Sequence, residues 1–330
     1  MNIVFLGTPD FAVPSLDKII ASRHKVLAVV TQPDKPVGRS GQICFSPVKQ
    51  VALQNGIKVL QYNKIRLEGV EDLKALKPDI MVTCAFGQIL SKEILEIAPH
   101  GVINVHGSLL PKYRGAAPIQ QAVINGDEET GVTIMKTEEG VDTGDMILVK
   151  KTPIYPNETA GELFERLSKI GAEAVVEALD LIEENKAVFV KQNDELATHV
   201  KMFKKEDGII NFSLSSKQIH DFVRGMNPWP CAFTFLNGKT LKVFKADVAD
   251  ALFGENNGCE NVGENSLGEI KNLACGAVAF ADKNHGLIIK TSSGGVRLAC
   301  LQEEGGKKME DKAFLLGHKI AAGTLLKSGK

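Results

Sequence analysis

Two polar side chains in the N-terminal half of the chain are placed to act on a carbonyl group. Asn104 and His106 belong to Val102–His106, whose composition is that of a buried strand. Because side chains alternate along a strand, Asn104 and His106 share one face while Val105 points to the other. An amide donor beside an imidazole can stabilise the oxyanion that forms when a carbonyl is attacked, and an imidazole can move a proton near neutral pH.

A carboxylate follows in the glycine-rich run GVDTGD at 140–145. Asp142 in this run can orient the imidazole or accept the proton of a nucleophile through a water molecule. Each feature also has an ordinary structural interpretation. A histidine at a strand end usually makes a structural hydrogen bond, and an aspartate in a glycine-rich turn is usually only part of that turn. The asparagine two residues before the histidine favours the chemical interpretation.

Strand-like and helix-like segments alternate over the first hundred residues, and this order positions the polar pair. Strands are predicted at 2–6, 25–31, 58–60, 79–84 and 102–106, and helices at 11–20 and 47–53, the second helix with Ser46 as its N-cap. The alternation predicts right-handed βαβ units, and hence an α/β domain with a Rossmann-like, doubly wound and mostly parallel sheet. Ligands of such sheets bind beyond the carboxyl ends of the strands, where Asn104 and His106 lie.

The character of the chain changes twice after this region. Residues 159–184 carry apolar side chains at three- and four-residue spacing, which predicts a long helix, whereas 191–207 are polar and aperiodic, as in a linker. Beyond a helical segment at 215–224, short strand-like runs alternate with Gly and Asn turns, which predicts a small OB-like β-barrel. The predicted domains are a catalytic domain at 1–190, a linker at 191–207 and a barrel at 208–330, with a mobile loop at 254–263.

The composition is that of a globular protein with balanced charge. The net charge of -1 excludes an overall basic surface but allows a local basic patch. The six cysteines form no C-x-x-C pair, so neither a metal site nor a disulfide framework is predicted. No signal-like segment precedes the first strand, and no apolar run reaches the roughly 20 residues that span a bilayer, so we expect a cytoplasmic protein without membrane attachment.

Six runs along the chain resemble the methionyl-tRNA formyltransferase family. They are FLGTPDF at 5–11, INVHGSLLP at 103–111, YRGAAPIQ at 113–120, GVTIM at 131–135, VDTGDM at 141–146 and NPWP at 227–230, in the family's order. The Asn-x-His pair with a later Asp is shared by the wider group of enzymes that use 10-formyltetrahydrofolate, and it indicates the chemistry. The first and last runs are typical of this family in particular.

The resemblance implies a transfer of the formyl group of 10-formyltetrahydrofolate to the amino group of initiator methionyl-tRNA, giving N-formylmethionyl-tRNA and tetrahydrofolate. Asn104, His106 and Asp142 would then be catalytic: the first two steady the oxyanion, and Asp142 fixes the imidazole and helps to remove the amine proton. No covalent enzyme intermediate and no metal are required.

Folate contacts are also implied by the resemblance. Without it, Ile89, Leu90, Leu109 and Leu110 would be interpreted as core. The implied contacts are Phe86, Gly87, Ile89, Leu90, Ser108, Leu109, Leu110, Pro111, Gly140 and Val141.

The resemblance further implies a monomer that binds tRNA through a loop carrying Arg39 and through Lys204, Lys205 and Arg224. The family commonly has two lysines after this Gly-Arg, whereas this chain has SGQ at 40–42. That departure weakens the expected electrostatic contact. From 205 to 330, 14 Lys and 2 Arg stand against 14 Asp and Glu, so domain charge alone does not indicate nucleic-acid binding.

Three other functions agree with parts of this pattern. An oxidoreductase is disfavoured because GTPD at 7–10 lacks the G-x-G-x-x-G fingerprint. A formyl-folate enzyme that acts on a small molecule, or that hydrolyses the folate, would share the three polar residues but would not need a barrel after Asp207. A catalytically silent tRNA-binding protein would be free to lose those residues.

Overall fold

Two compact units make up the chain in the computed structural model, which describes residues 1–37, 42–253, 270 and 272–327. The first unit comprises Met1–Ile119, Glu129–Pro153 and Glu162–Lys201, and the second comprises Gln120–Glu128, Ile154–Gly161 and Met202–Lys330. The predicted loop at 254–263 lies outside the described residues.

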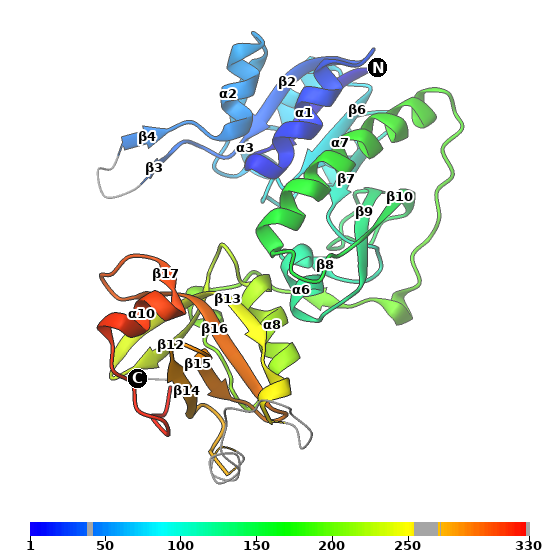
Figure 1. Cartoon of the computed structure of the whole chain (residues 1–330). Coiled ribbons are helices and arrows are strands. Elements are labelled where there is room, and N and C mark those ends of the chain that lie inside the picture. The colour runs from blue at the N-terminus through cyan, green and yellow to red at the C-terminus, as the bar shows by residue number, and fades with distance from the viewer. Residues whose placement is uncertain (38–41, 254–269, 271, 328–330) are drawn as a thin grey trace. The chain divides into compact units, whose positions relative to one another are not determined.

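A seven-stranded sheet is the centre of the first unit (Figure 1). Its order is β10-β9-β7-β6-β1-β2-β5. The strands are β1 (Asn2–Gly7), β2 (Lys25–Thr31), β5 (Lys58–Gln61), β6 (Ile80–Cys84), β7 (Val102–His106), β9 (Glu129–Lys136) and β10 (Met146–Pro153). Neighbours from β5 to β7 are parallel, which confirms the predicted doubly wound sheet, while β9 and β10 add an antiparallel edge.

Helices cover the sheet because each has an apolar face to bury. They are η1 (Asp10–Ala12), α1 (Val13–Ile20), α2 (Pro47–Gln54), α3 (Ile65–Glu68), α4 (Val70–Leu76), α5 (Lys92–Leu95) and α7 (Ala160–Glu183), whereas most of α6 (Pro118–Ile124) belongs to the second unit. Ser46 caps α2 as predicted, since its side chain accepts from the backbone of Lys49 at 3.2 Å. In α7, a Cβ at Gly171 would lie 2.9 Å from a methyl group of Val105, so this helix approaches β7 closely on the Val105 face.

Residues 191–207 are more ordered than their polar composition indicates. They include η2 (Asp194–Leu196), β11 (His199–Val200) and the start of η3 (Lys205–Gly208). Strand β11 pairs in parallel with β8 (Arg114–Gly115), and Gln192 is buried. A hairpin of β3 (Lys35–Val37) and β4 (Gln42–Cys44) also belongs to this unit.

The second unit is built on a sheet of short antiparallel strands. They are β12 (Ala232–Leu236), β13 (Lys239–Val248), β14 (Val278–Asp282), β15 (Gly286–Lys290), β16 (Gly295–Glu303) and β17 (Met309–Glu310). Helix α8 (Ser216–Gly225) precedes them, η4 (Asp250–Phe253) lies between β13 and β14, and α10 (Asp311–Gly317) follows them. Helix α8 starts with a capping box of Ser215 and Gln218. Near the end of the chain, Leu325 and Lys327 bridge to Ala277 and Phe235, which lie at opposite sides of the sheet, so this segment helps to close it, in agreement with the predicted barrel.

No helix among the described residues combines the length and the apolar character needed to cross a membrane.

Candidate active site

Asn104 and His106 lie on β7, in the register that the alternation predicts. Their neighbours across the sheet are Met135 and Thr133 of the antiparallel strand β9. Because α7 covers the Val105 face, the two polar side chains point to the opposite face of the sheet. Thr83 on β6 donates to Asn104 Oδ1 at 2.9 Å, so the amide oxygen faces Thr83 and the amide nitrogen is the donor of this side chain.

His106 is held in one orientation by a backbone carbonyl. The ring is buried, and its Nε2 lies 3.0 Å from the carbonyl oxygen of Tyr113. Since a carbonyl only accepts, Nε2 carries a proton, and Nδ1 is the ring atom that can take up or release one. Nδ1 lies 3.6 Å from Asp142 Oδ2, too far for a hydrogen bond but close enough to stabilise an imidazolium.

Asp142 reaches this place on the loop between β9 and β10. Its φ of 52° lies in the left-handed region, which aspartate tolerates better than most residues. The backbone amide of Gly115 donates to Oδ2 at 2.8 Å and holds the carboxylate. The structure therefore brings together the three side chains that were expected to be catalytic, and their roles remain predictions.

The contacts that orient the three side chains were not predicted from sequence. They come from Thr83, from the Tyr113 carbonyl and from the Gly115 amide. Gly115 has a φ of 110°, and a Cβ there would lie 2.3 Å from the carbonyl oxygen of Val200, so only glycine fits. The run YRG at 113–115 was noted for its resemblance, but its type and spacing gave no sign of these roles.

The expected folate segment at 86–90 divides into core and surface. Phe86 and Leu90 are buried in the hydrophobic core of the first unit, which is the structural interpretation that the sequence left open. Ile89 is 71% exposed, and Gly87 has a φ of 78°. Gln32 donates to the Phe86 carbonyl at 3.1 Å and fixes the start of the segment. Ile89 and the backbone near Gly87 are therefore the parts that a ligand can reach.

The expected segment at 108–111 is tied to β9. Ser108 is buried and donates to the Lys112 carbonyl at 2.6 Å, and the Leu110 amide donates to Thr133 Oγ1 at 3.2 Å. Leu109 and Pro111 are partly exposed, whereas Leu110 is buried. In the β9–β10 loop, Gly140 is exposed and Val141 is 63% exposed, so this loop presents apolar surface beside Asp142.

Cys84, at the carboxyl end of β6, is not placed to act as a nucleophile. Its thiol is fully buried and contacts the Phe11 carbonyl and Ser15 Oγ. Burial raises the pKa of this thiol to about 12, which keeps it protonated at neutral pH. This agrees with a transfer that needs no covalent enzyme intermediate.

The residues expected to bind tRNA have different surroundings. Arg39 lies outside the described residues. Lys204 and Lys205 are exposed at the start of η3. Arg224 is 7% exposed, and its guanidinium donates to Asp221 at 2.8 Å and to the Glu158 carbonyl at 3.0 Å. Arg224 is therefore engaged within its own unit.

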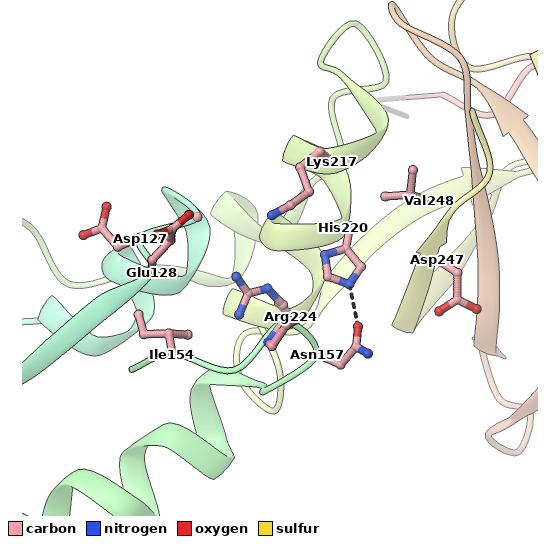
Figure 2. Close-up of a pocket in the computed structure, with 11 residues that line it drawn as sticks. Asp127, Glu128, Ile154, Asn157, Lys217, His220, Arg224, Asp247 and Val248 are labelled. Carbon is pink, nitrogen blue, oxygen red and sulfur yellow. Dashed lines mark hydrogen bonds between the residues drawn. The ribbon is translucent and has the colours of Figure 1, made fainter. Parts of the chain in front are cut away.

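A hollow of about 470 Å³ lies in the second unit and contains none of the expected catalytic residues. Figure 2 shows Lys217, His220 and Arg224 projecting from α8 toward it, with His220 bonded to Asn157. All three also bond to the carboxylate of Asp221, the helix residue between them. The basic side chains around this hollow therefore already bond to one buried carboxylate.

One group of possible metal ligands occurs among the described residues. His24, Asp180 and Glu183 have ligand atoms within 4.8 Å of one another. Arg23 already pairs with Asp180 at 2.7 Å and with Glu183 at 3.1 Å. The N-terminal ammonium also pairs with Glu183, at 2.8 Å, so two positive groups compensate the two carboxylates. The cluster thus joins the residues before β2 to α7 as an ion-pair network.

Comparison with known proteins finds relatives over nearly the whole chain. The formyl transferase model matches residues 1–179, and the model of the formyl transferase C-terminal domain matches residues 202–319. A methionyl-tRNA formyltransferase of Agathobacter rectalis is 45% identical over 98% of this chain and 99% of its own length. One of Geotalea daltonii is 46% identical over 99% of this chain and 98% of its own.

A solved structure shows a related fold. The N-formyltransferase of Helicobacter canadensis, in complex with folinic acid and dTDP-3-aminofucose, superimposes with a TM-score of 0.66 at 22% identity. The match covers 93% of this chain and 99% of that chain.

Proposed function

Since the chain belongs to the methionyl-tRNA formyltransferase family and formylates methionyl-tRNA with a formyl-folate donor, we propose that Asn104, His106 and Asp142 catalyse this transfer. The methionyl amine attacks the formyl carbon, and Asn104 donates to the oxygen on which negative charge develops. The bond between the formyl carbon and the folate nitrogen then breaks, so the formyl group moves to the amine.

The proton follows a path through His106 in this proposal. With Nε2 bonded to the Tyr113 carbonyl, Nδ1 takes the proton that the attacking amine loses and returns it to the folate nitrogen that leaves. Asp142, 3.6 Å from Nδ1, stabilises the imidazolium between these two steps. The observation on which the proposal rests is that His106 Nδ1 faces the Asp142 carboxylate, while the amide of Asn104 lies on the same strand as His106.

The formyl donor in this proposal is 10-formyltetrahydrofolate, and no metal takes part. Its ring contacts the segments at 86–90, 108–111 and 140–141, which carry the folate residues named above. Support comes from their position, since the first two follow β6 and β7 at the carboxyl end of the parallel sheet. Exposed Ile89 and Val141 supply the apolar surface that a planar ring needs.

We further propose that the tRNA is the initiator methionyl-tRNA, bound by a monomer in the cytoplasm. Arg39, Lys204 and Lys205 contact its phosphates. Arg224 is buried and bonded to Asp221, so we propose a structural role for it and no contact with the tRNA.

The test offers methionyl-tRNA and 10-formyltetrahydrofolate to the purified chain and measures formyl-methionine. We expect His106→Ala to lower kcat about a thousandfold, because it removes the proton carrier at the oxyanion site. The matched control is His100→Ala, at an exposed histidine of the same unit, which should keep wild-type turnover. Near-normal turnover of His106→Ala would refute the role, and formylation of a small amine in preference to methionyl-tRNA would favour the alternative substrate.

A further inference from the structure

The loop that carries Asp142 is held from behind by a buried glutamine. Gln192 is 4% exposed, and its side-chain nitrogen donates to the Asp142 carbonyl at 2.9 Å and to the Gly144 carbonyl at 2.8 Å. These two bonds enclose the turn on which the carboxylate stands. A left-handed residue such as Asp142 keeps its conformation only where its surroundings impose it.

An arginine fixes the orientation of this glutamine. Arg114 is also 4% exposed, and its Nε and Nη2 donate to Gln192 Oε1 at 3.0 and 2.9 Å. Because a guanidinium has donors and no acceptor, the amide oxygen of Gln192 must face it, so the nitrogen must face the loop. Asp194 accepts from Nη2 at 2.7 Å and completes the charge balance.

The same arginine lies between the two backbone groups that orient the catalytic pair. The residue before it, Tyr113, accepts from His106, and the residue after it, Gly115, donates to Asp142. The Tyr113 amide donates to Thr198 Oγ1 and the Arg114 amide to the Thr198 carbonyl, and these bonds hold the segment in place. Any displacement of Arg114 therefore moves the supports of His106 and Asp142 together.

We propose that Gln192 and Arg114 are a positioning pair for formyl transfer, in which the amide of Gln192 holds the Asp142 carboxylate at its distance from His106. The inference rests on the proposed catalytic role of Asp142. Neither side chain touches a substrate, so their effect is on geometry. A displacement of about 1 Å at a reacting group can cost about a hundredfold in rate.

The experiment compares Gln192→Ala with Gln192→Glu. The glutamate still accepts from Arg114, now as an ion pair, but it turns a carboxylate oxygen toward the two loop carbonyls in place of a donor, so the support of Asp142 is lost while the partner of Arg114 is kept. We expect both variants to lower kcat ten- to a hundredfold, with the KM for each substrate within about twofold of wild type. Glu195→Gln, an exposed change on the same segment, should leave kcat unchanged.

A double-mutant cycle separates positioning from general loss of structure. In single-turnover assays, Gln192→Glu should lower the rate less than about twofold when Asp142 is already Asn, because the carboxylate that it positions is gone. Full multiplication of the two effects, or normal kcat in Gln192→Glu, would overturn the inference while leaving the role of Asp142 intact. Full activity of Asp142→Asn alone would overturn the proposed function, and with it any role for a residue that positions that carboxylate.

Discussion

Two aspartates, one in each unit, have carboxylates in very different surroundings. Asp221 in the second unit is 3% exposed and accepts from Lys217, His220 and Arg224. Asp142 in the first unit accepts one backbone hydrogen bond at Oδ2, and its imidazole neighbour stands off at 3.6 Å. The carboxylate of Asp221 is saturated with donors. The carboxylate of Asp142 faces an imidazole to which it is not yet hydrogen-bonded.

The difference separates a structural ion cluster from the group that we propose to be catalytic. Burial alone would raise the pKa of Asp221, but the hydrogen bonds from its three partners outweigh it and lower the pKa to about 2. The charge of Asp221 is therefore constant at neutral pH. Asp142 lies beside a ring that gains a positive charge during the proposed reaction, so the favourable interaction grows in the transition state, where it accelerates the reaction.

Among changes to these two aspartates and their partners, the largest effect should follow from Asp142→Asn. Asparagine tolerates the left-handed conformation and still accepts from Gly115, so the loop should keep its shape while the negative charge is lost. We expect kcat to fall at least about a hundredfold with an unchanged melting temperature. Asp145→Asn, a neutralisation in the same loop, serves as the control and should retain turnover, and a similar loss in both variants would contradict a special role for Asp142.

A smaller effect, on stability alone, is expected from Asp221→Asn. The change leaves buried Arg224 without its carboxylate, so the free energy of unfolding at pH 7 should fall by about 2 kcal/mol, which corresponds to the lowered pKa. The only Trp of the chain, Trp229, belongs to the second unit, so its fluorescence during urea denaturation reports on that unit. Turnover below the melting temperature should be normal, and Asp247→Asn, at a less buried aspartate lining the same hollow, is the control.

The sign of the pH dependence follows from the lowered pKa. Asp221 stabilises the folded chain above its unfolded pKa of about 4, and this contribution is lost as the pH falls through about 2. The stability difference between wild type and Asp221→Asn should therefore shrink as the pH falls below about 4. A difference that grew on acidification would contradict the ion-pair assignment.

The smallest effect should come from Lys217→Met. The side chain of Lys217 is 63% exposed, so its pairing with Asp221 is screened by water. We expect a loss of about 0.5 kcal/mol or less in the same denaturation experiment. A cost equal to that of Asp221→Asn would mean that Lys217, and not buried Arg224, dominates the cluster.

Local patterns were sufficient to predict much of the first unit. The parallel strands, the Ser46 cap and the common face of Asn104 and His106 depend on periodicity and on capping chemistry, which act over a few residues. The antiparallel edge of β9 and β10 was missed, although it delivers the loop of Asp142. The polar composition of 191–207 predicts a linker. The order of this stretch comes from contacts with residues far away in the sequence, and such contacts leave no periodicity in the stretch itself.

By itself, the sequence determined which side chains are available for chemistry, that two of them share a strand face, and, through its motifs, the family. Only the tertiary structure decided that Asp142 stands at His106, that Gln192 supports its loop and that Arg224 is turned inward. The physical reason is that these contacts join residues far apart in the chain. Their closeness depends on the path of loops across a folded sheet, which no local spacing of residue types records.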